Sequence, residues 1–286
     1  MSPLLRTRLL ILLVLGGVTI IIWLVPFISY PTTCKCLTVN FLDVGQGDSI
    51  LIETPDNFEM LIDGGRDSSV LRMLGNERSF FDRNIDVVVA THPDLDHVGG
   101  LVDVLERYDV GTILLTENEQ DTPASAAFSA AAAAENAALI NPDAGEQFML
   151  GENVVISVLS PTGDERLWES NTASIVLKVT YGETSFMLTG DAPSEIENYI
   201  VETYGTFLDS DVLKLGHHGS KTSTSELFLD AVSPSYAVVS AAVGNSYGHP
   251  HQEVMQRVFA RNIQSFHTGT DGTVTFVSDG QTVWKK

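Results

Sequence analysis

Hydrophobic and polar residues alternate along most of the chain in short runs separated by glycine-rich turns. Short runs of β-branched and aliphatic residues are typical of strands, whereas apolar residues three and four positions apart are typical of helices. The pattern predicts strands at residues 37–45, 48–54, 59–65, 85–92, 111–116, 153–161, 211–220, 236–241, 264–269 and 272–285, and a hairpin at 174–191. It predicts helices at residues 70–81, 99–108, 124–139, 194–204, 224–232 and 252–261.

These elements form two sheet-rich halves, each with its own helices. No stretch rich in proline or serine separates the halves, so residues 37–286 are expected to form one domain. A sheet covered by helices on one face can bury its other face against a second sheet. The expected fold class is therefore α/β, a four-layer αββα sandwich with the helices outside two mixed sheets.

The first thirty residues have a different pattern. Residues 9–28 form an uncharged apolar run, close to the roughly 20 residues that a helix needs to cross a bilayer. Arg6 and Arg8 precede this run, so the amino terminus is expected to stay in the cytoplasm and the rest of the chain to be exported. We expect an N-terminal transmembrane signal anchor at residues 1–30 and a stalk at 31–36, which would hold an extracytoplasmic domain at the cell membrane. A cleaved signal peptide is the alternative.

Acidic residues far outnumber basic ones. The chain has 37 aspartates and glutamates against 16 lysines and arginines, which gives a formal net charge of -21. This balance opposes the uniformly basic surface of a nonspecific nucleic-acid binder. Contact with phosphates would have to come from local cations, a bound metal ion or a partner.

Histidines and aspartates gather in the segment THPDLDH, which follows a predicted strand. No histidine precedes His92, and six of the seven histidines lie in loops at the ends of predicted strands. Alternate side chains of such a loop can converge, so His92 and Asp94 could share one metal ion while Asp96 and His97 face another. Imidazole mixed with carboxylate suits zinc, manganese or iron.

Two later segments add candidate metal ligands. Asp191 ends the strand in FMLTGD, where its carboxylate could bridge two ions roughly 3.5 to 4 Å apart and orient an attacking water. His249 and His251 lie on a turn in NSYGHPH, and His249 is the expected remaining ligand. One or two divalent metal ions, zinc or manganese, are therefore the expected cofactor.

The segment LKLGHHGSKTS carries groups suited to an anionic substrate. Lys214, Ser220 and Lys221, together with backbone amides, could hold an anionic group. His217 or His218 could bind metal or protonate a leaving group. The expected catalytic residues are thus Asp96, Asp191, His217 and His218.

These segments, in this order, resemble the metallo-β-lactamase-fold hydrolase domain of the ComEC family of competence DNA-uptake proteins. The resemblance extends over nearly the whole of residues 37–286 and rests on FLDVGQGDSILIE, LIDGG, THPDLDHVGG, LTGD, LKLGHHGSKTS and YGHPH. It implies an αββα sandwich, a metal site between the sheets and a nuclease or phosphodiesterase activity. The residues that match the family's metal-binding motifs are His92, Asp94, Asp96, His97 and Asp191.

Two positions depart from the wider superfamily. Asp94 stands where the motif HxHxDH has its second histidine, as in ComEC-like members. No histidine lies between His97 and His217 to serve as the usual ligand ahead of Asp191, and Asn171 in that region is a poorer ligand. Oxygen ligands at the first metal position would favour a harder ion such as manganese.

The expected function is that of a membrane-anchored extracytoplasmic metal-dependent hydrolase. It would be a phosphodiesterase or nuclease of the ComEC-like type, with a metal-activated water, a phosphodiester substrate such as DNA, and a partner in the uptake machinery. One alternative is a hydrolase of another substrate, such as a choline-phosphate ester, a lactone or a β-lactam. The other is a catalytically silent accessory or binding protein of DNA uptake.

Overall fold

The computed structural model describes residues 35–78, 82–118 and 120–286, together with Arg6 and Gly16. The chain divides into two units, Met1–Lys35 and Cys36–Lys286. The expected anchor and stalk at residues 1–36 lie outside the described residues, except for Arg6, Gly16, Lys35 and Cys36. Within the described part of the chain, no helix is both long enough and apolar enough to span a bilayer.

The second unit contains two sheets. In the described residues the first sheet has eight strands in the order β15-β14-β1-β2-β3-β4-β5-β6, and the second has seven in the order β13-β12-β11-β10-β9-β8-β7. The first sheet consists of β1 (Leu37–Phe41), β2 (Ile50–Glu53), β3 (Glu59–Ile62), β4 (Asn84–Ala90), β5 (Asp109–Leu115), β6 (Ala138–Ile140), β14 (Val274–Ser278) and β15 (Val283–Lys285). The second consists of β7 (Gln147–Leu150), β8 (Val154–Ser160), β9 (Val176–Tyr181), β10 (Thr184–Leu188), β11 (Val212–Lys214), β12 (Tyr236–Val239) and β13 (Gln264–His267).

Each sheet combines an antiparallel and a parallel half. Strands β3, β4, β5 and β6 run parallel in the first sheet, and β10, β11, β12 and β13 run parallel in the second. The other neighbours pair antiparallel, including β9 with β10, which confirms the predicted hairpin. Parallel strands end at the same edge of a sheet, so the loops after them meet at one rim.

The two sheets bury a common apolar layer. Leu37, Val39 and Phe41 alternate along β1 and all lie in this layer, as a strand with one buried face requires. Phe276 of β14 contacts Phe41 edge-on at 6.2 Å between ring centroids, and it contacts Phe186 of the opposite sheet at 6.5 Å. This layer is the central core of the domain.

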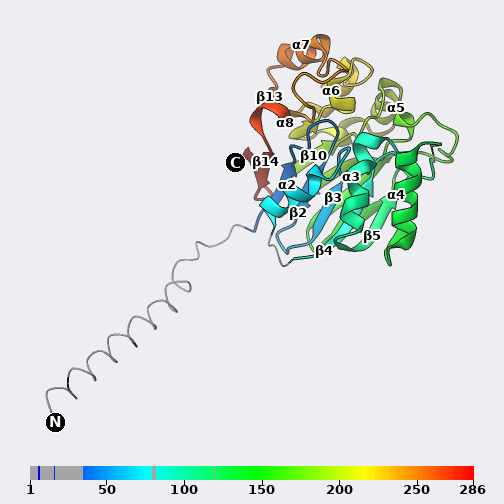
Figure 1. The fold of residues 1–286 in the computed structure, drawn as a ribbon. Coiled ribbons are helices and arrows are strands. Elements are labelled where there is room, and N and C mark those ends of the chain that lie inside the picture. The colour runs from blue at the N-terminus through cyan, green and yellow to red at the C-terminus, as the bar shows by residue number, and fades with distance from the viewer. Residues whose placement is uncertain (1–5, 7–15, 17–34, 79–81, 119) are drawn as a thin grey trace. The chain divides into compact units, whose positions relative to one another are not determined.

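Helices cover the outer face of each sheet (Figure 1). Apolar side chains of α2, α3 and α4 pack on the first sheet, and those of α5, α6 and α7 pack on the second. The predicted four-layer αββα sandwich is therefore confirmed. The helices are α2 (Ser69–Glu77), α3 (Leu95–Leu105), α4 (Pro123–Ala134), α5 (Ser194–Tyr204), α6 (Glu226–Val232), α7 (Gln252–Ala260) and α8 (Thr268–Asp271), with 3-10 helices η1 (Asn171–Ala173), η2 (Gly205–Leu208) and η3 (Gly216–Gly219).

Several predicted boundaries differ from the structure. The alanine-rich helix expected at 124–139 ends at Ala134, because the residues that follow pair with β5 as strand β6. Helix α3 begins at Leu95, four residues before the predicted start, because Asp94 occupies its N-cap position in an extended conformation. The edge strand β7 was not predicted from its short sequence QFML.

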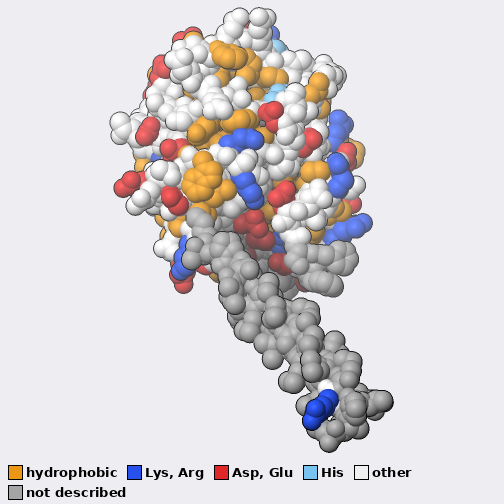
Figure 2. All heavy atoms as spheres, turned by 90° about the vertical axis from the view of Figure 1, so that its left-hand side faces the viewer, with side chains coloured by type: hydrophobic (Ala, Val, Ile, Leu, Met, Phe, Trp, Pro, Cys, Tyr) orange, Lys and Arg blue, Asp and Glu red, His pale blue; other side chains and the backbone are white. Residues whose placement is uncertain are grey.

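Charged side chains of both signs lie at the surface. Figure 2 shows one face of the molecule, on which acidic and basic side chains are interspersed among exposed hydrophobic ones. Exposed hydrophobic side chains are common on soluble domains and need a further observation before they indicate a function.

Candidate metal centre

Loops from both sheets bring the candidate residues to one rim. Asp63 follows β3 and His92 follows β4 in the first sheet, whereas Asp191 follows β10 in the second. His217 and His218 lie in η3, directly beyond β11. The meeting of parallel strand ends from two sheets therefore collects residues that are far apart in sequence.

Four buried side chains each present one polar atom without a hydrogen-bond partner. These atoms are Nε2 of His92, His97 and His218, and Oδ1 of Asp191. The Oδ2 atom of Asp191 lies 3.4 Å from Nε2 of His97 and 3.3 Å from Nε2 of His218. An unsatisfied buried polar atom costs about 1 to 3 kcal/mol, so such a concentration favours a bound ligand.

The same residues fit a divalent metal ion. Ligand atoms of His92, His97 and Asp191 lie within 4.8 Å of one another, and so do those of Asp96, His97 and His218. Imidazole nitrogens and carboxylate oxygens are the donors that zinc, manganese and iron take in proteins. The cluster is therefore a candidate metal centre.

The other ring nitrogen of each imidazole is held in place. Nδ1 of His97 donates to Oδ2 of Asp63 at 2.7 Å, and Nδ1 of His218 donates to a main-chain carbonyl at 2.9 Å. Nδ1 of His92 lies 3.0 Å from Oγ1 of Thr91. Metal-binding histidines commonly have such partners, which fix the tautomer and direct the Nε2 lone pair at the ion.

Asp63 is a central residue that the sequence analysis did not assign to the site. Its side chain is fully buried, and it accepts hydrogen bonds from the amide and the hydroxyl of Thr91 at 2.8 and 2.7 Å, besides that from His97. The available signal was LIDGG, a carboxylate at a strand end followed by two glycines. Such a residue orients a ligand without itself facing the centre.

Glycines allow the loop after β3 to touch α3. A Cβ atom on Gly100 would lie 2.0 Å from the carbonyl oxygen of Gly64, so only glycine fits this contact. The amide of Gly64 donates to the carbonyl of His97 at 2.7 Å. The first helical turn, which carries Asp96, is thereby fixed against the loop of Asp63.

Lys214 has a different environment from the one that the sequence analysis expected. It was assigned to substrate binding, but its side chain is fully buried and forms an ion pair with Asp48. Its ammonium also donates to the carbonyl of Gly190 at 2.9 Å and lies 3.6 Å from Oδ1 of Asp191. Asp48, which the sequence analysis did not assign, lies 3.3 Å from Nδ1 of His218. Lys214 therefore neutralises a buried carboxylate behind the centre.

Burial and charge shift the pKa values of the clustered groups. Burial would lower the pKa values of His97 and His218, but the carboxylate of Asp191 leads the opposing influences and raises both well above the usual value. Burial would raise the pKa of Asp191, but these two histidines lower it well below the usual range. Burial, followed by the charge of His97, lowers the pKa of His92 to about 3, so its imidazole is neutral. Strongly shifted groups are typical of functional sites.

Asp94 and Asp96 lie at the mouth of the cluster. Oδ2 of Asp96 is 3.6 Å from Nε2 of His218. Oδ2 of Asp94 is 3.8 Å from Nε2 of His92, while its Oδ1 accepts a hydrogen bond from the hydroxyl of Ser170 at 2.6 Å. Both carboxylates therefore lie beside the buried ligand atoms, and both are partly exposed.

Three further histidines, His217, His249 and His251, extend from the cluster towards solvent. Nε2 of His217 lies 3.6 Å from Oδ2 of Asp191, and its side chain is 25% exposed. The ring of His249 lies 5.5 Å from that of His217 and 4.9 Å from that of His251. His217 and its neighbour His218 both have left-handed backbone conformations, with φ of 48° and 55°. Such conformations are uncommon for residues other than glycine and are often found at functional sites.

Ser220, Lys221 and Asn171, also considered at this rim, have no contact with the ligand atoms among the hydrogen bonds and ion pairs described above. Ser220 is buried, and its hydroxyl oxygen accepts a hydrogen bond from that of Thr222 at 3.0 Å. Lys221 is exposed, and its amide donates to Nδ1 of His251 at 3.1 Å. Asn171, the poorer ligand in the region ahead of Asp191, has a buried side-chain oxygen without a hydrogen-bond partner.

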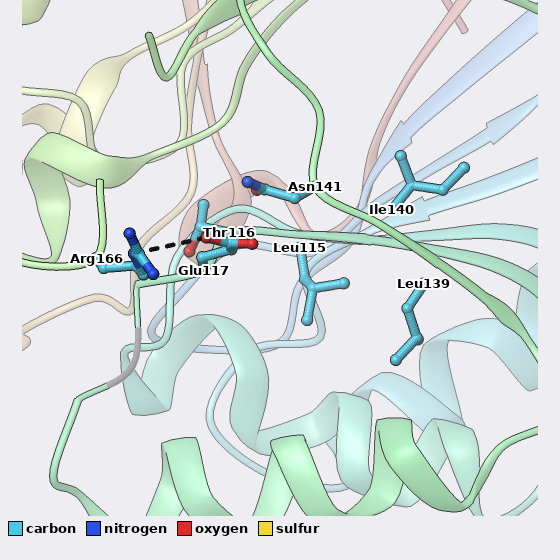
Figure 3. A pocket seen from close by; sticks show the side chains of 7 residues that line it. All are labelled: Leu115, Thr116, Glu117, Leu139, Ile140, Asn141 and Arg166. Carbon is cyan, nitrogen blue, oxygen red and sulfur yellow. Dashed lines mark ion pairs between the residues drawn. The ribbon is translucent and has the colours of Figure 1, made fainter. Parts of the chain in front are cut away.

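A pocket of ≈ 690 Å³ lies at the end of β5, and none of these ligand residues lines it (Figure 3). Arg166 on one side of it lies 3.7 Å from Glu117. The lining residues are Leu115, Thr116, Glu117, Leu139, Ile140, Asn141 and Arg166. Leu115 and Thr116 also line a neighbouring cavity of ≈ 40 Å³ that His92 reaches. The converging donor atoms, rather than the pocket, define the candidate site.

Comparison with curated proteins identifies relatives over most of the chain. ComE operon protein 3 of Bacillus subtilis is 30% identical over 282 residues, which cover 93% of this chain and 36% of that protein. Competence protein ComA of Neisseria gonorrhoeae is 32% identical over 261 residues, which cover 90% of this chain and 35% of that protein. The chain thus spans about a third of the length of these relatives, and the resemblance to competence proteins is confirmed.

Comparison with solved structures supports the fold. Igni18, a metallo hydrolase from the archaeon Ignicoccus hospitalis, superimposes with a TM-score of 0.55 at 16% identity, over 84% of this chain and 98% of that one. Residues 42–243 match the family model described as the metallo-beta-lactamase superfamily. Given this match, the two-sheet sandwich and the histidine and aspartate cluster at its rim, the chain belongs to the metallo-beta-lactamase superfamily.

Proposed function

We propose that this protein is a metal-dependent hydrolase of phosphodiesters, with DNA among its substrates. The observation that carries the proposal is the convergence of unpartnered atoms from His92, His97, His218 and Asp191. Similarity to two competence proteins supports the phosphodiester class, because DNA is a phosphodiester polymer.

The proposed metal ligands are the residues around the cluster. His92, His97, His218 and Asp191, with Asp96 beside them, would hold one or two divalent ions, zinc or manganese. When bound, such an ion lowers the pKa of a coordinated water to near neutrality and so supplies a nucleophile. The partly exposed Asp94 would be a further ligand to the ion that His92 binds. His249 lies on the solvent side of His217 and His218 and is not among the proposed ligands.

The protein's own residues would position water and substrate. One carboxylate oxygen of Asp191 lies within 3.6 Å of Nε2 of His97, His217 and His218, so this carboxylate is placed to orient a water at the centre. His217 is the partly exposed imidazole nearest to this carboxylate, so it is placed to exchange a proton with a substrate oxygen. Because Lys214 is buried, Lys221 is the exposed lysine of this loop that could contact a phosphate.

The proposed location is the outer face of the cell membrane. The uncharged run at residues 9–28 and the arginines before it support an anchor with the hydrolase domain outside the cytoplasm. The similarity to competence proteins supports a role beside a DNA-uptake machinery, which would also deliver the substrate to a strongly acidic protein.

The test uses the purified full chain, stripped of metal and then supplied with manganese or zinc. We expect cleavage of bis-nitrophenyl phosphate and of labelled single-stranded DNA, both dependent on the added metal. Asp96→Ala should abolish turnover of both substrates, because it removes a carboxylate beside the proposed ions. Glu106→Ala, an exposed residue at the end of the same helix, is the matched control and should keep full turnover.

Each outcome selects one interpretation. Full metal-dependent activity in Asp96→Ala would contradict the assignment of this site. Cleavage of bis-nitrophenyl phosphate but not of DNA would indicate that the substrate is another phosphodiester. If a chromogenic cephalosporin were hydrolysed and neither phosphodiester were cleaved, the substrate would be a β-lactam. Metal binding without hydrolysis of any of these substrates would favour a binding protein.

A further inference from the structure

We propose that Tyr247 is a stacking platform for a nucleobase next to the scissile phosphate, so that the preferred substrates are single-stranded nucleic acids. The inference rests on the proposed hydrolase function and names the substrate class of the same site. Tyr247 lies in the loop between β12 and α7, which also carries His249.

The ring of Tyr247 is exposed, although it is ordered by a neighbour. The residue is 58% exposed, and its ring stacks on that of His249 with 5.7 Å between centroids and 22° between planes. One face of the ring is therefore covered by His249. An aromatic ring left this exposed contributes little apolar burial to folding, which leaves its other face available to a ligand.

A series of rings connects Tyr247 to the metal centre. The ring of His249 lies 5.5 Å from that of His217 and 6.3 Å from that of His218. Nε2 of His217 in turn lies 3.6 Å from Oδ2 of Asp191. A substrate whose phosphate reaches Asp191 would therefore bring its neighbouring groups along these rings.

Asn245 fixes the loop that presents the ring. Its Nδ2 donates to the carbonyls of Ala242 and His249 at 2.9 and 2.6 Å. Its Oδ1 accepts hydrogen bonds from the amides of Tyr247 and His249 at 3.1 and 3.0 Å. All four hydrogen-bonding capacities of this amide side chain are thus used on the loop. The conformational entropy of the loop is lost on folding rather than on binding, which favours ligand affinity.

A nucleobase suits this surface better than the other groups that phosphodiesters carry. Every base has a flat π face, and stacking on an aromatic side chain strengthens binding by on the order of tenfold per base. A choline group would instead need a cage of several rings around its ammonium. In the described part of the chain, Tyr247 packs against one other ring, that of His249.

The acidic composition strengthens this choice. With a formal net charge of -21, the protein cannot rely on a broad basic surface to attract the phosphate backbone. Stacking is not driven by net charge, so it can hold a nucleic acid where long-range electrostatics do not. The metal centre would hold the phosphate, and Tyr247 would hold the adjacent base.

The experiment compares two esters with the same leaving group. Thymidine 5′-p-nitrophenyl phosphate carries a base, and methyl p-nitrophenyl phosphate does not. In the metal-loaded full chain, Tyr247→Ala should lower kcat/KM for the thymidine ester on the order of tenfold more than for the methyl ester. Tyr247→Phe keeps the ring and should stay near wild type. Tyr199→Ala, which removes a 40% exposed tyrosine from α5, should leave both activities unchanged.

The outcomes separate the subsite from the proposed function. Equal losses for the two esters in Tyr247→Ala would overturn the subsite and leave the hydrolase intact. A larger loss for p-nitrophenyl phosphorylcholine than for the thymidine ester would overturn the assignment to a base. If the wild type hydrolyses no ester, the proposed function fails. Quenching of 2-aminopurine in a single-stranded oligonucleotide then decides the subsite, because loss of quenching in Tyr247→Ala supports it and unchanged quenching overturns it.

Discussion

Asp63 connects the two histidines of the THPDLDH segment to the rest of the first sheet. It holds His97 directly and reaches His92 through Thr91, whose hydroxyl contacts both side chains. A fixed carboxylate partner keeps the imidazole in the tautomer that leaves Nε2 free for a metal ion. The geometry of the proposed centre therefore depends on a residue that does not face it.

Asp63→Asn should weaken metal binding. The substitution preserves size, but its amide nitrogen would face either Thr91 or His97, both of which donate hydrogen bonds here. We expect manganese or zinc affinity to fall about 10- to 100-fold, as measured by calorimetric titration. Asp67→Asn, an exposed carboxylate in the same loop, is the control and should bind as the wild type does. Wild-type affinity in Asp63→Asn would show that this residue does not orient the ligand.

Individual residues were predictable where their chemistry is distinctive. His92, His97, His218 and Asp191 converge, and all four were predictable from their positions after predicted strands. Asp63 and Asp48 were missed because an aspartate next to glycine also fits an ordinary turn. The burial of Lys214 was missed because it depends on how the two sheets pack, which local sequence does not specify.

At the scale of elements, the contact between α3 and the loop after β3 fixes the site. The amides and carbonyls of the two segments are hydrogen-bonded, and glycines stand where the backbones are closest. This contact explains the glycine pairs in LIDGG and DHVGG. It also explains why the first turn of α3 can present Asp96 and His97 next to residues from other strands.

Gly100→Ala should disturb this contact. The added methyl group would overlap the carbonyl oxygen of Gly64, so α3 would have to move, with a loss of about 1 to 3 kcal/mol in unfolding free energy. Gly75→Ala in α2 is the matched control, because no atom lies within 4 Å of the new Cβ there. It should stabilise by about 0.5 to 1 kcal/mol, since alanine favours helix over glycine. Urea denaturation measures both, and equal effects would contradict the steric argument.

The sequence predicted the main strands and helices but not all their ends. A β-rich run predicted β1, and residues 174–191 were expected to form the hairpin of β9 and β10. The helix expected at 124–139 was too long because alanine favours helix locally. Residues 138–140 instead form strand β6, because they pair with β5. Edge strands such as β7 are short and partly exposed, so their hydrophobic pattern is weak.

At the scale of the whole molecule, the four-layer sandwich could be predicted because two groups of strands each came with their own helices. The rim where both sheets end was also predictable, since candidate ligands followed strands in both halves. Which ring nitrogens face each other could not be predicted, because that depends on hydrogen bonds between loops. The acidic composition and the local cluster together suit a protein that binds its substrate through a metal centre rather than through a broad basic face.

The measurement that tests the central claim most directly is a metal titration of the stripped full chain, with bound manganese or zinc quantified per chain. We predict one or two equivalents in the wild type, and a sharp loss of affinity in His218→Ala, which removes one of the unpartnered Nε2 atoms. Because a ligand that binds only the folded state stabilises it, the wild type should also gain about 2.7 kcal/mol at a hundredfold excess over Kd. No bound metal in the wild type, or equal stoichiometry and affinity in His218→Ala, would contradict the assignment of this cluster as a metal centre.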